Sequence, residues 1–263
     1  MESVVQIYKK NGETPLEALE NFRAEMASKE PARKKFWQTV SMTYAGRLDP
    51  MAEGVLMILI GEECKNKDKY LGFDKQYEVE IVFGISTDSH DALGLARIHD
   101  DKNFPMPDLS KYIGKFKQKY PAYSSKTVGG KQLHSLARTG ELPEEMPEKE
   151  VEIYSIETLK VGGNDELGNN GELGKIDASK LKGRILSTIN LVKGDFRQEE
   201  IKRRWNEVLP DTVKGSTRKF HIIKIVVNCS SGTYMRSLAD RIGQDIGIGA
   251  FALSIKRIKI YSA

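Results

Sequence analysis

The sequence predicts an α+β fold in which helices and loops flank a mixed β-sheet. Residues 75–84 alternate between apolar and polar side chains, as a half-buried strand does. Residues 55–60 form an unbroken apolar run that suits a fully buried strand. Thr14, Pro15 and Glu17 have the order of an N-cap, a first-turn proline and a capping-box glutamate, so a helix is expected to begin here.

The other elements follow from similar signals. Strands are expected at residues 3–8, 151–161, 184–192, 219–228 and 250–261. Helices are expected at residues 62–71, 108–118, 195–209 and 233–247, and loops at residues 31–35 and 121–138. Residues 162–174 are rich in glycine, asparagine and acidic residues, which is typical of a flexible excursion. Because no repeat or strong boundary interrupts the chain, we expect one domain over residues 1–263.

Composition limits the possible partners. The net charge of +4 permits a polyanionic partner without requiring one. No apolar run is long enough to cross a bilayer, and the N-terminal residues lack the pattern of a signal peptide, so we expect no membrane association. Cys64 and Cys229 are far apart and in no ligand spacing. We therefore expect neither a disulfide nor a zinc site, and a cytoplasmic location fits.

One carboxylate, Asp49, lies in a loop that also contains Gly46, Pro50 and Gly54, directly before the apolar run 55–60. Pro50 restricts the backbone of Asp49 to extended conformations, and the glycines permit turns. A carboxylate on a stiff loop beside a buried strand can serve as a nucleophile or as an acid/base group. An ordinary Asp-Pro turn is the alternative, and this stretch alone favours that alternative.

Two other stretches could bind anions. The polar segment 121–138 interleaves cations with rings, which suits nucleic acid, although a solvated loop has a similar composition. Arg236 lies where a strand gives way to a helix and could hold a phosphate or the carboxylate of Asp49, or be a surface arginine. Residues 86–91 contain Asp88, His90 and Asp91, but their spacing matches no metal site and indicates turn chemistry.

Several stretches, in order, resemble one family of enzymes. Residues 46–56 read Gly-Arg-Leu-Asp-Pro-Met-Ala-Glu-Gly-Val-Leu, residues 75–77 read Lys-Gln-Tyr, and residues 229–238 read Cys-Ser-Ser-Gly-Thr-Tyr-Met-Arg-Ser-Leu. Residues 121–138 resemble the family's thumb, and residues 9–14 resemble a degraded form of its N-terminal motif. The family is that of the RNA pseudouridine synthases of the bacterial tRNA pseudouridine-55 type, TruB.

This resemblance implies the pseudouridine synthase fold, with a central mixed, mainly antiparallel sheet. It also implies isomerisation of a uridine to pseudouridine in RNA, at U55 in the T-arm of tRNA. By the same resemblance Asp49 is the catalytic carboxylate, Tyr77 stacks on the target base and helps to remove its C5 proton, and Arg236 pairs with Asp49. The residues expected to bind the substrate are Tyr44, Arg47, Ile255, Lys126, Lys131, Arg138, Tyr234 and Lys9.

The resemblance implies no cofactor and no metal, tRNA as partner, and a monomer without a protein partner. It divides the domain into a thumb at about residues 120–140 and an insertion at about residues 162–217, with no C-terminal PUA domain. The family's Gly-His pair is here Thr43-Tyr44, and Lys10 replaces a proline. These departures leave open a catalytically silent RNA-binding or chaperone module of the same fold. The same isomerase acting on another RNA is a further alternative.

Overall fold

The computed structural model describes residues 3–99, 104–159, 173–210 and 218–261, and its centre is one β-sheet. The strands of this sheet are β1 (Val4–Lys9), β2 (Met42–Ala45), β3 (Ala52–Ile60), β4 (Lys75–Phe83), β7 (Gly114–Lys119), β10 (Glu148–Leu159), β11 (Gly174–Asp177), β12 (Lys219–Cys229) and β13 (Ala250–Ile260). Small two-stranded sheets are formed by β5 (Ile85–Thr87) with β6 (Ala96–Ile98) and by β8 (Thr127–Val128) with β9 (Lys131–Gln132).

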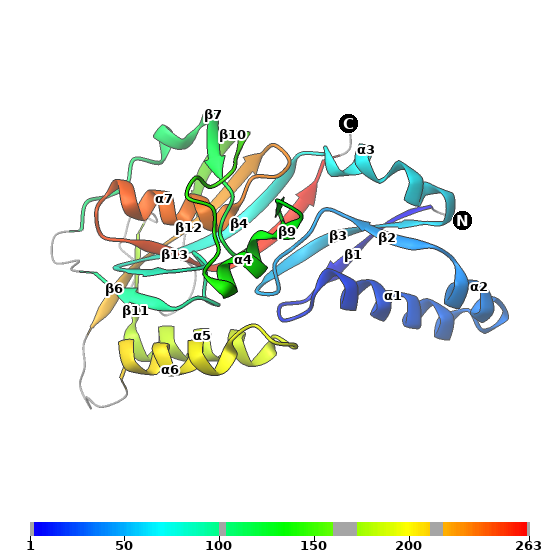
Figure 1. Ribbon diagram of the computed structural model, residues 1–263, viewed down its shortest axis with the longest axis horizontal. Helices are drawn as coiled ribbons and strands as arrows, with labels where there is room; N and C mark the ends of the chain where they lie inside the picture. The colour runs from blue at the N-terminus through cyan, green and yellow to red at the C-terminus, as the bar shows by residue number, and fades with distance from the viewer. Residues whose placement is uncertain (1–2, 100–103, 160–172, 211–217, 262–263) are drawn as a thin grey trace.

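The helices are distributed around this sheet (Figure 1). They are α1 (Pro15–Lys29), α2 (Lys34–Thr39), α3 (Lys67–Leu71), α4 (Leu133–Thr139), α5 (Ala178–Leu191), α6 (Gln198–Val208) and α7 (Met235–Asp245), with 3₁₀ turns at Pro31–Arg33, Gly61–Asn66 and Leu109–Tyr112. None of the helices in the described ranges combines the length and the apolar character that crossing a membrane requires.

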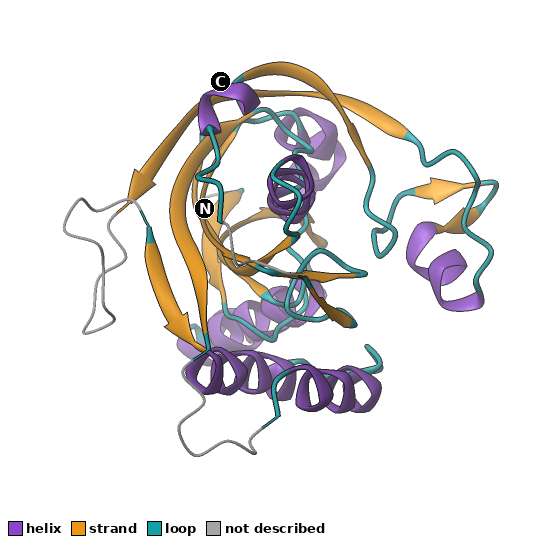
Figure 2. Cartoon of the chain, turned by 90° about the vertical axis from the view of Figure 1, so that its left-hand side faces the viewer, coloured by secondary structure: helices purple, strands orange, loops and turns teal. Residues whose placement is uncertain are grey.

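The strand order confirms the expected mixed, mainly antiparallel α+β architecture. The central order is β1-β3-β13-β4-β12-β10-β7, with β2 beside β3 and β11 beside β12. Only β13 and β3 pair in parallel among the described strands, whereas β13 and β4 pair in antiparallel fashion. The strands curve around helices rather than lying flat (Figure 2). The last described strand therefore lies in the middle of the sheet and joins its two halves.

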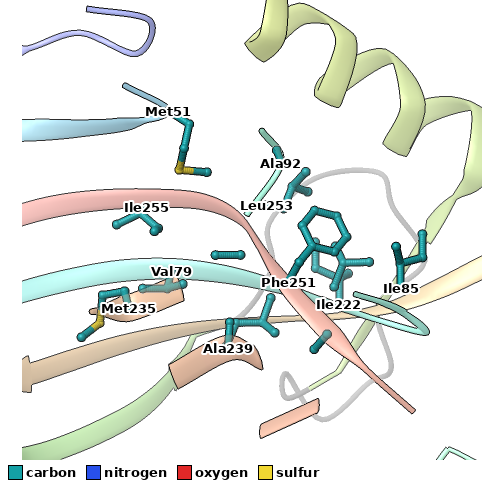
Figure 3. Packing of buried hydrophobic residues seen from close by; sticks show 14 of the residues in the cluster. Met51, Val79, Ile85, Ala92, Ile222, Met235, Ala239, Phe251, Leu253 and Ile255 are labelled. Carbon is teal, nitrogen blue, oxygen red and sulfur yellow. The ribbon is translucent and has the colours of Figure 1, made fainter. Parts of the chain in front are cut away.

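The main core lies between the middle of the sheet and the helices on its two sides. Val79 and Phe251 are buried in it, together with Ala239 from α7 (Figure 3). Trp205 of α6 packs against Phe251 at 5.4 Å between ring centroids, and its indole Nε1 donates to the carbonyl of Ala92 at 3.2 Å. Helices α7 and α6 cover the sheet. Towards the end of β4, the residues on both faces of the strand are therefore apolar and buried.

The predicted start of α1 is confirmed at atomic detail. The Thr14 hydroxyl accepts from the backbone N–H of Glu17 at 3.1 Å, and the Glu17 carboxylate accepts from the N–H of Thr14 at 2.7 Å. This reciprocal pair satisfies two amides that the helix leaves without partners. The strands expected around residues 3–8, 55–60, 75–84, 151–161, 219–228 and 250–261 are also present.

Three kinds of element prediction were wrong: one strand, one helix and two loops. The stretch expected as a strand at residues 184–192 is helical up to Leu191, because Leu181, Ile185 and Ile189 repeat every four residues and are buried on one side of α5. The helix expected at residues 108–118 is only a 3₁₀ turn. Asp108 does accept from the N–H of Ser110 at 3.1 Å, but the chain then enters β7 and pairs with β10.

The third error concerns the two segments expected to be loops. Residues 31–35 belong to a 3₁₀ turn and α2. Trp37 of α2 is buried in a cluster with apolar residues of α1, including Leu19. Residues 121–138 contain the β8–β9 hairpin and most of α4, whose Leu133 and Leu136 are buried. The flexible excursion expected at residues 162–174 lies almost wholly outside the described residues.

Candidate active site

A cleft of about 720 Å³ opens between the loop before β3, the start of β4, the end of β13 and the start of α7. Asp49, Tyr77 and Arg236 all contribute to its lining. These residues come from three separate parts of the chain, so the fold brings together the three groups that the sequence analysis singled out.

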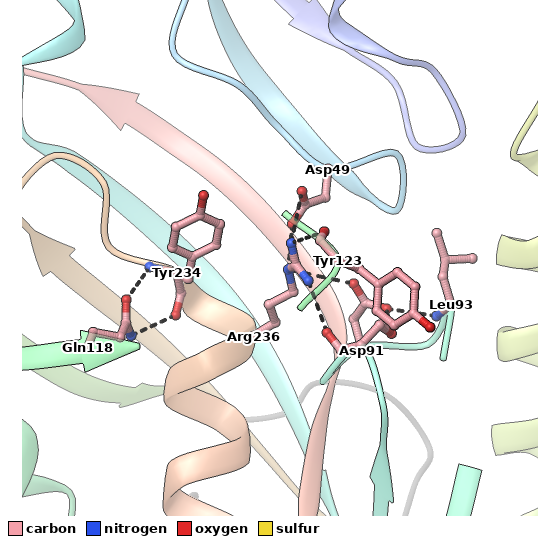
Figure 4. A network of polar contacts seen from close by, with 8 residues as sticks. Asp49, Asp91, Leu93, Gln118, Tyr123, Tyr234 and Arg236 are labelled. Carbon is pink, nitrogen blue, oxygen red and sulfur yellow. Dashed lines mark hydrogen bonds and ion pairs between the residues drawn. The ribbon is translucent and has the colours of Figure 1, made fainter. Parts of the chain in front are cut away.

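Asp49 and Arg236 are in direct contact, although 187 positions separate them in the sequence (Figure 4). Arg236 Nε donates to Asp49 Oδ2 at 2.8 Å, and Arg236 Nη2 donates to Asp49 Oδ1 at 3.4 Å. A two-point contact of this kind fixes the plane of the carboxylate as well as its position. The side chain of Asp49 remains 35% exposed and that of Arg236 only 2%, so the carboxylate keeps a face open to the cleft.

Arg236 is held by further acceptors on its buried side. Nη1 donates to the carbonyl of Ser89 at 3.1 Å and Nη2 to that of Tyr123 at 2.9 Å. The carboxylate of Asp91 lies 3.9 Å from its Nε. Burial works against the charged guanidinium, but the carboxylates of Asp49 and Asp91 outweigh it and raise the pKa of Arg236. This arginine is therefore a fixed cation.

The sequence analysis did not assign Asp91 to the site. Its Oδ1 accepts from the Ser89 hydroxyl at 2.6 Å and from the Leu93 N–H at 2.9 Å, which is the turn chemistry that was expected. Burial raises the pKa of Asp91 to about 6, although Arg236 acts in the opposite direction. The only signal in the sequence was a cluster of acids directly after a strand, and turn residues give the same signal.

Tyr77 and Ile255 form an apolar wall of the cleft. Tyr77 is 9% exposed and Ile255 is 5% exposed. They lie on the neighbouring strands β4 and β13, where Tyr77 pairs with Arg257 and Ile255 pairs with Val79. Burial, as the largest cause, raises the pKa of the Tyr77 hydroxyl. The phenol is therefore un-ionised at neutral pH and can present a flat ring to a planar ligand.

Arg257 is a second buried arginine that the sequence analysis missed. Its side chain is 1% exposed, and it lines the cleft. Nε donates to the carbonyl of Val55 at 2.6 Å and Nη1 to that of Arg47 at 3.2 Å. Because these carbonyls lie on either side of Asp49, Arg257 ties both ends of its loop together. A lone arginine within the apolar strand 250–261 was the available signal.

Lys9 does not lie where the sequence analysis placed it. It was expected to contact the substrate, but its side chain is 0% exposed and does not line the cleft. Its ammonium donates to the carbonyls of Ala52 at 2.5 Å, Lys10 at 3.2 Å and Pro50 at 3.4 Å. Burial lowers the pKa of Lys9 to about 8, with Asp49 opposing the change. Lys9 therefore supports the Asp49 loop from behind.

The remaining predicted residues divide into two groups. Tyr44, Arg47, Arg138 and Tyr234 line the cleft. Lys126 and Lys131 do not: the ammonium of Lys126 lies 5.2 Å from the centre of the Tyr120 ring, and that of Lys131 forms an ion pair with Glu141 at 2.9 Å. Both lysines therefore lie outside the cleft lining.

The loop of residues 86–91 holds no metal-like arrangement. Within the described parts of the chain, no group of three or more histidine, cysteine, aspartate and glutamate side chains is arranged to hold a metal ion. His90 lies 3.7 Å from Asp240, but burial lowers the pKa of His90 to about 4, so the contact is not an ion pair at neutral pH.

Comparison with known proteins assigns the family. Residues 33–171 match the family model described as "TruB family pseudouridylate synthase (N terminal domain)". The chain belongs to the TruB family. This confirms the resemblance drawn from the sequence motifs. The TruB-type fold is also supported by a crystal structure of a Cbf5-Nop10-Gar1 complex, which matches with a TM-score of 0.52 over 98% of this chain and 48% of that chain. At 14% identity, that likeness concerns the fold alone.

Curated TruB relatives carry related names. The chain is 30% identical over 224 residues to tRNA pseudouridine synthase B of Xanthomonas axonopodis pv. citri, covering 82% of this chain and 53% of that protein. It is 30% identical over 257 residues to tRNA pseudouridine synthase 4 of Saccharomyces cerevisiae, covering 89% of this chain and 63% of that protein. The chain thus spans about half to two thirds of the length of these relatives.

Proposed function

We propose that this protein isomerises a uridine to pseudouridine in tRNA, at U55 of the T-arm, with Asp49 as the catalytic carboxylate. The observation that carries the proposal is the two-point contact between Arg236 and Asp49 inside a cleft walled by Tyr77. Membership of the TruB family and the names of the curated relatives support the same reaction and the same class of RNA.

The reaction rearranges one nucleotide without adding or removing atoms. The N1–C1′ bond breaks, the uracil turns over, a C5–C1′ bond forms, and the C5 proton is replaced by one at N1. Asp49 can attack C1′ as a nucleophile or accept the C2′ proton as a base. Both routes need a carboxylate with one face towards the sugar, and the exposed side of Asp49 supplies that face.

The surrounding residues have distinct roles in this proposal. Arg236 positions Asp49 through its forked contact and is too buried to be displaced by solvent. Tyr77 stacks on the uracil and helps to remove its C5 proton, while Ile255 packs against the edge of the base. The cleft has room for an extruded nucleotide, whose unstacking costs roughly a few kcal/mol.

The RNA stem and loop are held outside the cleft. We assign this contact to the thumb at residues 120–140, where Lys126 and Lys131 face phosphates, and to Arg138, Arg47, Tyr44 and Tyr234 at the rim. Such contacts recognise the backbone and the shape of the RNA. We propose that the protein acts as a monomer in the cytoplasm. Cys64 and Cys229 are both unpaired, which fits a reducing compartment.

The test is incubation with a T-arm stem-loop RNA, followed by mass spectrometry after pseudouridine-specific derivatisation. The wild-type protein is expected to modify one uridine, and Asp49→Asn is expected to make no product while still binding RNA. Equal product from Asp49→Asn contradicts the role of Asp49. Salt-sensitive binding with no product from the wild type would instead indicate a silent RNA-binding module.

A second experiment identifies the target. Pseudouridine sites are mapped in RNA from cells with and without the gene, and the T-arm uridine is expected to lose its modification in the latter. Loss at other RNAs only, with the T-arm site retained, would assign the enzyme a different substrate.

A further inference from the structure

The turn between α5 and α6, residues 192–197, has no part in the function proposed above. We call it the hairpin tip. It belongs to the segment 162–217, which the sequence analysis identified as an insertion, and α5 and α6 project it towards the cleft (Figure 1). Although it is a surface turn, it contacts several of the segments that line the cleft.

The first contacts join the tip to the thumb. The Arg197 guanidinium lies 4.2 Å from the centre of the Tyr123 ring and forms an ion pair with Asp88 at 3.0 Å. Arg138 donates to the carbonyl of Asp195, and its Nη1 lies 3.6 Å from the Asp195 carboxylate. The Tyr123 carbonyl also accepts a hydrogen bond from Arg236. Tyr123 therefore connects the tip to the Asp49–Arg236 pair.

The tip is also ordered by its own hydrogen bonds. The Gln198 amide donates to the carbonyls of Val192 at 3.2 Å and Gly194 at 2.6 Å, and its oxygen accepts from the N–H of Phe196 at 2.8 Å. Arg197 has φ 62°, a left-handed conformation that is unfavourable for arginine. Such outliers persist where the surroundings impose them, and here the contacts to Asp88 and Tyr123 do so.

The end of α5, directly before the tip, contacts the N-terminal loop. A side chain at Gly12 would collide with the backbone of Leu191 at the end of α5, so the two segments touch. Thr14 and Pro15, which follow Gly12, line the cleft. The end of α5 and the hairpin tip together thus extend along one side of the cleft from the N-terminal loop to the thumb.

Phe196 is the residue that this arrangement presents. It lines both the main cleft and a side hollow of about 70 Å³ that is also lined by Asp49 and Arg236. It is the only phenylalanine in the main cleft lining among the described residues, where the other aromatic rings belong to tyrosines and to His134. Phe196 is half-buried, so part of its surface is available to a ligand.

We propose that Phe196 contacts a nucleobase of the substrate next to the extruded uridine, and that the hairpin tip and the thumb, which contact each other, form one RNA-binding surface. This rests on the proposed function and extends it to a specific substrate contact. A partly exposed ring beside the catalytic pair suits an unpaired base, because single-stranded RNA is bound by stacking on aromatic side chains. Arg138, which lines the same two hollows as Phe196, can contact a phosphate. Arg197 is a positioning residue that aims the ring.

The first experiment measures the affinity of Phe196 variants for a T-arm stem-loop RNA by fluorescence anisotropy. Phe196→Ala and Phe196→Leu are expected to raise the Kd by about 5- to 150-fold, the range of one base–aromatic stack. Phe196→Trp, which keeps an aromatic ring, is expected to have a Kd close to that of the wild type. Phe36→Ala, which removes an exposed ring on α2, is the matched control and leaves the Kd unchanged. An unchanged Kd for Phe196→Leu, with unaltered thermal unfolding, overturns the proposal.

The second experiment locates the base. In a series of RNAs, each with one loop nucleotide made abasic, Phe196→Ala should lose no further affinity for the RNA that lacks its partner base. If Phe196→Ala costs the same affinity with every RNA, the ring contacts no base. Because both measurements concern binding, they remain valid if the wild type makes no pseudouridine, which would remove the proposed function alone.

Arg197 is tested separately. Arg197→Gly removes the contacts to Tyr123 and Asp88 but relieves the unfavourable backbone conformation. A positioning role predicts a Kd raised at least about fivefold, with an unchanged single-turnover rate at saturating RNA and an unchanged or higher Tm. A lower Tm without a change in Kd would show that Arg197 only stabilises the fold.

Discussion

Asp91 Oδ2 lies 3.9 Å from Arg236 Nε, and the two side chains are 5% and 2% exposed. Asp49 contacts the same guanidinium from the cleft side. One arginine is therefore shared by a carboxylate that is open to the cleft and one that is buried. The charge of the buried partner determines how strongly the arginine holds the open one.

Asp91→Asn tests this sharing. The amide oxygen still accepts from Ser89 and Leu93, but the charge facing Arg236 is lost. We expect the single-turnover rate at pH 7.5 to fall by about 10- to 100-fold, because the guanidinium that positions Asp49 loses the second carboxylate that holds it in place. Because the pKa of Asp91 is about 6, the wild-type rate should approach that of the variant as the pH falls below 6. A constant ratio of the two rates from pH 5 to 8 would contradict this prediction.

Arg236→Lys separates charge from geometry. Lysine keeps the positive charge but loses the fork that holds both oxygens of Asp49 and the carbonyls of Ser89 and Tyr123. Misplacement of a reacting group by about 1 Å costs roughly 10²-fold in rate. We expect a fall of this size in the single-turnover rate, with RNA affinity nearly unchanged. A variant within twofold of wild type would show that charge alone is sufficient.

His90 and Asp240 are predicted to give opposite pH dependences of stability. Burial raises the pKa of Asp240 to about 6 from 3.8, so its contribution to stability is lost as the pH rises from 3.8 to 6. Burial lowers the pKa of His90 to about 4 from 6.5, so its contribution increases as the pH rises from 4 to 6.5. Each change amounts to about 3 kcal/mol.

Replacing one of the two residues should therefore reveal the pH dependence of stability that the other one causes. Relative to wild type, the unfolding free energy of Asp240→Asn should rise between pH 4 and 6.5, and that of His90→Asn should fall. Asparagine suits position 90, where φ is 65°. Chemical denaturation at several pH values measures both slopes. If the unfolding free energy of both variants changed with pH as that of the wild type does, the protonation states assigned to His90 and Asp240 would be wrong.

Lys9→Met tests the support of the Asp49 loop. The apolar chain fills the same space but leaves the carbonyls of Pro50 and Ala52 without their buried donor. We expect a loss of stability of about 1.5–3 kcal/mol and a slower single-turnover rate, with little change in RNA affinity. The neighbouring Lys10→Met is the control, because Lys10 is exposed. A lower RNA affinity at an unchanged rate would instead return Lys9 to the substrate-binding group.

Gly54→Ala tests the close approach of the Asp49 loop to β13. Gly54 has φ 113°, and a Cβ at this position would overlap the backbone of Arg257. We expect a loss of about 3 kcal/mol or more in the free energy of unfolding. Gly61→Ala is matched, because φ is 65° there but the space around it is open, and about 1–2 kcal/mol is expected. Equal losses would mean that backbone strain alone, and not the contact with Arg257, explains the cost.

The sequence pattern correctly predicted those helices and strands whose signal lies entirely within their own residues. The capping box of α1 and the alternation in β4 needed no information from elsewhere in the chain. Residues 184–192 were misread, because a short apolar stretch is compatible with either a strand or a helix. Only the buried positions Leu181, Ile185 and Ile189 reveal the helical repeat, and it begins before the stretch that was interpreted.

The site was predictable in part for the same reason. Asp49, Tyr77 and Arg236 lie in recognisable motifs, so their meeting could be expected. Arg257 depends on the insertion of β13 between β3 and β4, which sets it beside Tyr77 and behind the Asp49 loop. Strand order and register are not contained in the periodicity of any one strand. The burial of Lys9 has the same origin, since two of its three hydrogen-bond acceptors, Pro50 and Ala52, are 41 and 43 residues away.

The central place of β13 has a consequence for how the protein is made. During synthesis every other described strand leaves the ribosome before residues 250–260 do. Until then, the part of the sheet that carries the Asp49 loop has no hydrogen-bonded link to the part that carries Tyr77. The nascent chain should therefore expose two open strand edges, on β3 and on β4, until β13 pairs with both and completes the cleft.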